Sequence, residues 1–188
     1  MKNDLEPGIV DREAVLSSCF NCLVNMGLEH STMRAFVKAT GMNSSSLYYR
    51  FKDKNQIVLE SSYYGLKNIT QNLFLVAVNN LDEFENLFDV FFIESEKYKP
   101  AIKLIYQVAN SPVYGDQLRE LSKQLIPVYK KITILLAKKL NCATESLEPF
   151  VDLFISSIRE YIIWGNSDVT KRNLKFLYDG AMKLTKLF

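Results

Sequence analysis

Residues 31–54, STMRAFVKATGMNSSSLYYRFKDK, predict two short helices joined by a tight turn, followed by the start of a third helix. Ser31 or Thr32 can cap the first helix, since a hydroxyl oxygen satisfies one of the backbone N–H groups left free at a helix start. Gly41 ends that helix, at a position where a positive φ is often needed. Asn43 then provides the cap of the second helix.

The second helix of this segment has an apolar face and a polar face. Leu47 and Phe51 are four residues apart, so they point inward on the same face. The residues left largely on the outside are Ser44, Ser45, Ser46, Tyr48, Tyr49 and Arg50. This layout is typical of a helix-turn-helix, whose second helix enters the major groove of DNA. The alternative is an ordinary helical hairpin with a polar face.

The charge distribution favours a DNA contact in the same segment. The chain has 188 residues and a formal net charge of only +2, which is weak for a nucleic-acid-binding protein. Residues 31–54, however, contain five basic residues and one acidic residue, which gives a local net charge of +4. A phosphate backbone attracts such a local excess of positive charge.

The same stretch resembles the N-terminal domain of TetR-family transcriptional regulators. The positions that match the family pattern are Thr32, Met33, Phe36, Gly41, Met42, Asn43, Leu47, Tyr48, Phe51, Asp53, Lys54 and Ile57. An upstream helix also fits, with Val15, Leu16, Cys19, Leu23 and Gly27 in register. Val37, Ser45 and Arg50 depart from the pattern, and the last two lie where they would change which DNA sequence is read.

The resemblance implies a homodimeric, ligand-responsive regulator, most often a repressor, that binds an inverted-repeat operator in double-stranded DNA. We expect Arg34, Lys54 and the hydroxyl of Tyr48 to bind phosphates, and Tyr49 and Arg50 to carry more of the sequence choice than the serines. The full set of expected DNA contacts is Thr32, Arg34, Ser44, Ser45, Ser46, Tyr48, Tyr49, Arg50 and Lys54. The alternative is an all-α small-molecule-binding or interaction module without DNA binding.

The rest of the chain is predicted to be helical as well. No segment gives a convincing strand, so the expected fold is all-α. We expect a helix-turn-helix DNA-binding domain over residues 1–54 and a helical effector-binding and dimerisation domain over residues 55–188. Apolar residues at helical spacing predict helices over residues 11–26, 53–78, 82–96, 100–109, 111–140, 147–164 and 168–187, with Pro127 kinking or dividing the fifth.

The second domain carries two further expectations. The helix at 149–164 is apolar on nearly every side, and the resembled family forms its dimer interface from the last two helices. The expected interface residues are Ile155, Ile158, Ile162, Leu174, Leu177 and Ala181. The resemblance also implies a cavity for an apolar or aromatic effector, with Phe88, Phe92, Tyr106, Tyr129 and Phe154 as candidate lining residues. The alternatives are a monomeric bundle and aromatic residues that only fill the core.

The cysteines and the N-terminus predict no further chemistry. Cys19 and Cys22 form a C-x-x-C on the apolar face of the first helix, which favours buried core over a thiol sensor. With one His and only Cys142 besides them, a zinc site lacks ligands, and no catalytic motif is present, so we expect no metal, cofactor or enzymatic activity. The acidic start, MKNDLEPGIV, and the absence of a long apolar run predict a cytoplasmic protein without membrane contact.

Overall fold

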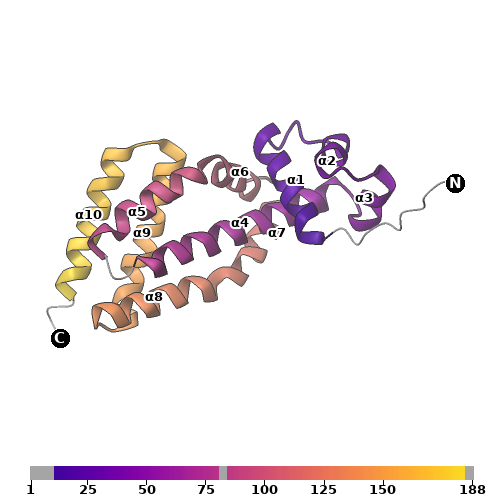
Figure 1. Cartoon of the computed structure of the whole chain (residues 1–188). Coiled ribbons are helices and arrows are strands. Elements are labelled where there is room, and N and C mark those ends of the chain that lie inside the picture. The colour runs from indigo at the N-terminus through magenta and orange to yellow at the C-terminus, as the bar shows by residue number, and fades with distance from the viewer. Residues whose placement is uncertain (1–10, 81–83, 185–188) are drawn as a thin grey trace. The chain divides into compact units, whose positions relative to one another are not determined.

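The structure is a computed structural model that describes residues 11–80 and 84–184. Every regular element among these residues is helical, which confirms the predicted all-α fold (Figure 1). The α-helices are α1 (Arg12–Met26), α2 (Met33–Thr40), α3 (Ser44–Arg50), α4 (Lys54–Asn79), α5 (Phe84–Lys97), α6 (Lys99–Ala109), α7 (Gly115–Ser122), α8 (Ile126–Leu140), α9 (Thr144–Trp164) and α10 (Ser167–Leu184).

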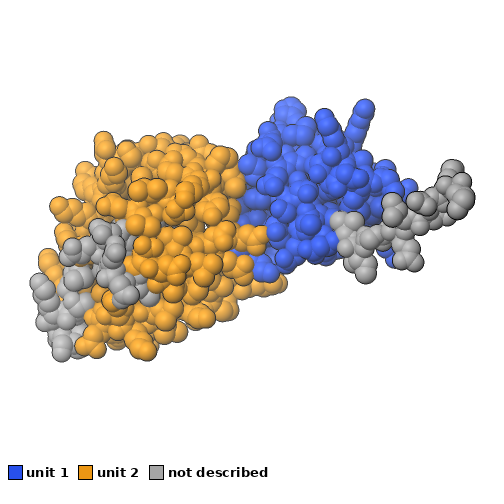
Figure 2. Space-filling view, viewed as in Figure 1, with its two compact units in different colours: residues 1–67, 104–122 blue, residues 68–103, 123–188 orange. Residues whose placement is uncertain are grey.

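The chain groups into two compact units, which Figure 2 colours separately. Unit 1 consists of residues 1–67 and 104–122, and unit 2 consists of residues 68–103 and 123–188. Unit 1 therefore combines α1, α2, α3 and the first part of α4 with a segment distant in sequence, which holds the end of α6 and all of α7. The expected division of function at residue 54 follows a different boundary and stays a prediction.

The core of unit 1 is built from large apolar side chains of its N-terminal helices. Leu23, Phe36, Leu47, Phe51 and Ile57 are all fully buried. Burying such a side chain stabilises the fold by roughly 1.5–3 kcal/mol relative to leaving it exposed. Helices as short as α2 and α3 are marginal on their own, so this shared core holds the pair in place.

Unit 2 contains two apolar clusters. The first joins Ala77 of α4 to α8, α9 and α10, and its other buried members are Leu136, Ala137, Leu140, Leu147, Val151 and Ala181. The second lies between α9 and α10, with Phe92, Ile102 and Phe154 packed against its buried members Ile158, Tyr161, Ile162 and Leu174. The ring centroids of Phe92 and Tyr161 are 4.5 Å apart. The apolar sides of α9 are thus largely used within unit 2.

Helix boundaries differ from the predictions in two places. The helix expected over residues 111–140 is divided into α7, a 3₁₀ turn at Lys123–Leu125, and α8. Pro127 lies in the first turn of α8, where its missing N–H costs no helical hydrogen bond, so the predicted division is confirmed. The helix expected to begin at residue 147 begins at Thr144 instead and includes Pro149. Burial of Leu147 and Val151 on either side of Pro149 offsets the hydrogen bond lost there.

Candidate nucleic-acid interface

The two short helices of unit 1 are capped as their sequence requires. The side-chain oxygen of Thr32 accepts a hydrogen bond from the N–H three residues on, at 3.2 Å, so Thr32 rather than Ser31 caps α2. Gly41 follows α2 with φ at 67°, in the left-handed region. The side chain of Asn43 accepts a hydrogen bond at 2.7 Å from the N–H three residues on and caps α3. These local signals fix where the turn between the helices begins and ends.

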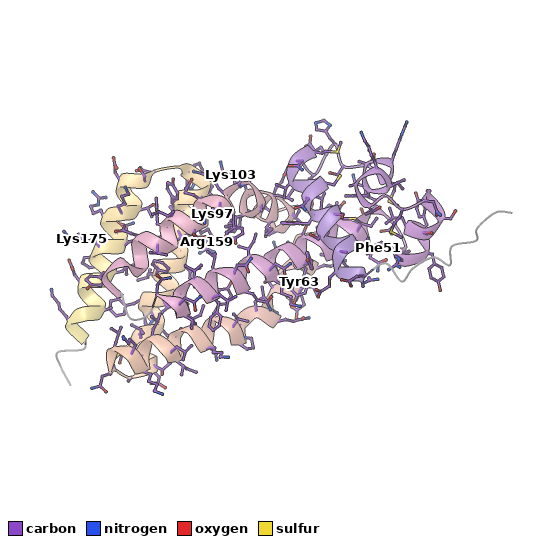
Figure 3. All side chains as sticks on the ribbon, viewed as in Figure 1. Phe51, Tyr63, Lys97, Lys103, Arg159 and Lys175 are labelled. Atoms are coloured by element: carbon purple, nitrogen blue, oxygen red, sulfur yellow. The ribbon has the colours of Figure 1, made fainter. Side chains whose placement is uncertain are left out.

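α3 turns its apolar face into unit 1 and its polar face to solvent. Leu47 and Phe51 are fully buried, and Figure 3 shows Phe51 among the helices of unit 1. On the other face, Tyr48 is 50% exposed and Tyr49 is 92% exposed. Hydroxyl groups and rings on an exposed helix face are suited to contacts with phosphates and base edges.

All residues expected to contact DNA lie in unit 1, on α2, on α3, at the cap of α2 or at the first residue of α4. The exposed ones are Thr32, Arg34, Ser44, Ser45, Tyr48 and Tyr49, and the partly buried ones are Ser46, Arg50 and Lys54. Among the described residues, no carboxylate pairs with Arg34, Arg50 or Lys54. Their charges are therefore available to a polyanion. The role of each residue on DNA stays a prediction.

A polar network holds the link between α3 and α4. The guanidinium of Arg12 forms an ion pair with Glu60 and lies 5.0 Å from the centre of the Phe51 ring. Glu60 also accepts a hydrogen bond from the side-chain amide of Gln56 at 2.7 Å. Gln56 in turn accepts one from the backbone N–H of Lys52 at 2.7 Å. Because Arg12 and Glu60 are 48 residues apart, no local spacing in the sequence reveals this network.

A second long-range contact reaches the start of α4. The hydroxyl of Tyr114, in the turn between α6 and α7, donates to Oδ1 of Asn55 at 2.9 Å. Burial, with Asp53 as the smaller cause, raises the pKa of the Tyr114 hydroxyl still further above neutral pH. Asn55 follows Lys54 directly in the chain. No motif or spacing in the sequence points to either partner of this contact.

The C-x-x-C cysteines lie in the core of unit 1, as predicted. Cys19 is 0% exposed and Cys22 is also buried. Burial, with Cys22 as the smaller cause, raises the pKa of the Cys19 thiol to about 12. Burial also raises the pKa of Cys22. Since the thiolate is the reactive form, protonated thiols in the core disfavour the thiol-sensor alternative.

The residues expected at a dimer interface lie mainly in the core of unit 2. Five of the six are buried within the single chain, namely Ile158, Ile162, Leu174, Leu177 and Ala181. Neighbouring helices of unit 2 already cover these side chains, and their place at a dimer interface stays a prediction. The large apolar side chains that α9 and α10 leave exposed are Leu153, Ile163, Trp164 and Phe176. Of these, Trp164 and Phe176 are each 75% exposed.

The expected pocket residues do not form one group. Phe92 and Phe154 pack against the same cluster of unit 2, whereas the hydroxyl of Tyr129 lies 3.3 Å from that of Thr70 on α4. Tyr106 belongs to unit 1. The side chain of Phe88 lies outside the described residues. The effector pocket therefore stays a prediction.

The described residues contain neither a metal-binding cluster nor a membrane-spanning helix. No three His, Cys, Asp or Glu side chains of residues 11–80 and 84–184 come close enough together to hold a metal ion. Within the same part of the chain, no helix has both the length and the apolar character needed to cross a bilayer.

The fold and this surface define a class of protein, the all-α proteins with an N-terminal helix-turn-helix. Residues 16–61 match the family model of bacterial regulatory proteins, tetR family. The N-terminal part of the chain is therefore similar to the DNA-binding domain of the tetR family. A solved structure from Shewanella sp. PV-4, described as that of a tetR family transcription regulator, shares the fold at a TM-score of 0.52. The two are 11% identical over 92% of this chain and 94% of that one. No curated protein matches the chain.

Proposed function

We propose that the chain is a transcriptional regulator that binds double-stranded DNA with α3 in the major groove. The observation that carries the proposal is the exposed face of α3, with Tyr48 and Tyr49 in solvent above the fully buried Leu47 and Phe51. The second helix of a helix-turn-helix needs one face packed in the core of its domain and the opposite face exposed to DNA. The match of residues 16–61 to the tetR family supports the same reading.

Binding to any long DNA duplex, followed by fluorescence anisotropy at increasing salt, tests this proposal. Phosphate contacts release counterions, so affinity should fall steeply as salt concentration rises. A folded chain that fails to bind duplex DNA at low salt contradicts the proposal. That result would favour the alternative, a small-molecule-binding or interaction module without DNA binding.

We further propose a homodimer that uses the exposed apolar side chains of α9 and α10. Trp164 and Phe176 are the most exposed of these, and large aromatic side chains are typical anchors of protein interfaces. Light scattering at micromolar concentration should give about twice the chain mass of 21.7 kDa. The double substitution Trp164→Glu and Phe176→Glu should return the single-chain mass. An exposed position on α8, Ile134→Glu, is the matched control and should leave the mass unchanged.

The regulatory part of the proposal is a repressor released by a small apolar or aromatic molecule. The aromatic side chains of unit 2 support this chemistry, since most ligand sites are lined by apolar and aromatic groups. A thermal-shift screen of such compounds, followed by DNA binding with each compound that stabilises the chain, tests it. Compounds that raise the melting temperature and weaken DNA binding support the proposal. Stabilisers that leave DNA affinity unchanged contradict it.

A further inference from the structure

The first turn of α4 is held from two directions within unit 1. Its N-terminus is capped by Asp53, whose Oδ1 accepts a hydrogen bond from the N–H of Gln56 at 2.9 Å. On one side the Arg12–Glu60–Gln56 network reaches this turn. On the other side Tyr114, 59 residues away in sequence from its partner, donates to Asn55. Polar contacts from two distant segments therefore meet on the turn that carries Lys54.

The Tyr114 contact comes from a rigid support. Tyr114 is buried, and its own backbone oxygen accepts the N–H of Leu118 at 2.9 Å in the first turn of α7. The N–H of Gly115 donates to the oxygen of Ser111 at 2.8 Å. A Cβ atom on Gly115 would lie 2.5 Å from the backbone oxygen of Ala109, so only glycine fits this turn without displacing backbone. The hydroxyl of Tyr114 thus projects from a closely packed turn at the start of α7.

We propose that Tyr114 is a positioning residue, which fixes the first turn of α4 and with it Lys54 for binding a DNA phosphate. This inference rests on the proposed function. Tyr114 is buried and donates its hydroxyl to Asn55, which follows Lys54 in the chain. The Lys54 ammonium favours an anion, and it meets a phosphate at a fixed place only if this turn keeps one orientation.

Loss of the Tyr114 contact should change DNA affinity in a characteristic way. A phosphate contact carries no sequence information, so losing its orientation should weaken binding to all duplexes by the same factor. The salt dependence should also become shallower, because fewer phosphates are neutralised. A purely structural role for Tyr114 would lower the melting temperature and leave the affinity of the folded chain unchanged.

The test is a double-mutant cycle in the full chain with Tyr114→Phe, Asn55→Ala and both together. Affinity is measured on a selected operator and on a scrambled duplex, well below the melting temperature of every variant. Tyr114→Phe should weaken binding to both duplexes equally, by about 2- to 10-fold. The double variant should lose little more than Asn55→Ala alone, because both changes remove the same hydrogen bond. Ser122→Ala is the control, since its hydroxyl donates only to the backbone oxygen of Arg119 within α7.

The outcomes distinguish failure of the positioning role of Tyr114 from failure of the proposed DNA binding. Unchanged affinity in Tyr114→Phe, or losses that add in full in the double variant, would overturn the positioning role while DNA binding by the wild type stands. A wild-type chain that binds neither duplex would overturn the proposed function, and this inference with it.

Discussion

The ring of Phe20 in α1 lies directly against the backbone of Gly65 in α4. A Cβ atom on Gly65 would be 2.2 Å from Cζ of that ring, well inside van der Waals contact. Phe20 is buried, so the ring has little room to move. The absence of a side chain at residue 65 is therefore what lets α1 approach α4 closely within unit 1.

Gly65→Ala should lower the stability of the chain. Overpacking a core costs roughly 1–3 kcal/mol, while alanine regains about 1 kcal/mol of helix propensity over glycine. The net loss in the free energy of unfolding should be about 1 kcal/mol, measured by denaturant titration. Gly180→Ala in α10 is the matched control, because the Phe150 ring that it would meet is only partly buried and can swing aside. Equal effects of the two substitutions would contradict the account of Phe20 and Gly65.

The cap of α3 gives a second prediction. Asn43→Ala removes the hydrogen bond at 2.7 Å to the N–H of Ser46. The loss of such a cap costs about 1 kcal/mol, and α3 has only seven residues over which to absorb it. DNA affinity should fall together with stability, whereas Asn43→Asp, which keeps an accepting oxygen, should retain most of the stability. An Asn43→Ala variant as stable as the wild type would show that the core alone fixes α3.

The pH dependence of stability should report the buried thiol of Cys19. Its pKa is raised by burial from 9.0 to about 12 in the folded chain, so the folded state keeps a proton that the unfolded state loses. The free energy of unfolding should therefore fall as pH rises from 9 toward 12, by up to about 1.4 kcal/mol per pH unit for one thiol. In Cys19→Ala this contribution is absent. The stability difference between wild type and Cys19→Ala should thus shrink with rising pH, and a constant difference would contradict the raised pKa.

Lys54 and Arg50 should differ in their effects on DNA binding. Lys54→Ala should weaken binding to all sequences alike and flatten the salt dependence by about one unit per half-site, as expected for a phosphate contact. Arg50→Ala should cost about 1–3 kcal/mol on the best operator and relax the preference at one position of each half-site, as expected for a base contact. Salt titrations of both variants on operator and scrambled duplex distinguish the two roles. Equal losses on both duplexes in Arg50→Ala would make Arg50 another phosphate contact.

The helix-turn-helix was predictable because its signals are local. The caps Thr32 and Asn43, the break at Gly41 and the spacing of Leu47 and Phe51 each act within four residues. The buried face of α4 is less apparent from the sequence because it includes two polar side chains, Ser61 and Ser62, which are both fully buried. Ser61 satisfies its hydroxyl with the backbone oxygen four residues earlier, at 2.6 Å, and needs no distant partner.

Periodicity could not predict which apolar side chains of α9 stay exposed, nor the polar network. A helix that is apolar on several sides has the same pattern whether a side faces its own bundle or a partner, so Ile158 and Ile162 were indistinguishable from Leu153 and Trp164. Long-range polar contacts such as Tyr114 to Asn55 depend on how segments far apart in sequence pack. No spacing rule within one helix contains that information.

Selection of bound DNA from a random duplex pool tests the central proposal most directly. The full chain should enrich one motif, an inverted repeat, because a two-fold dimer presents two equivalent copies of α3. Repeating the selection with Arg50→Ala should retain the repeat and relax one position in each half. Binding that depends on salt but enriches no motif, or a motif without two-fold symmetry, would contradict a dimeric regulator that reads its operator with α3.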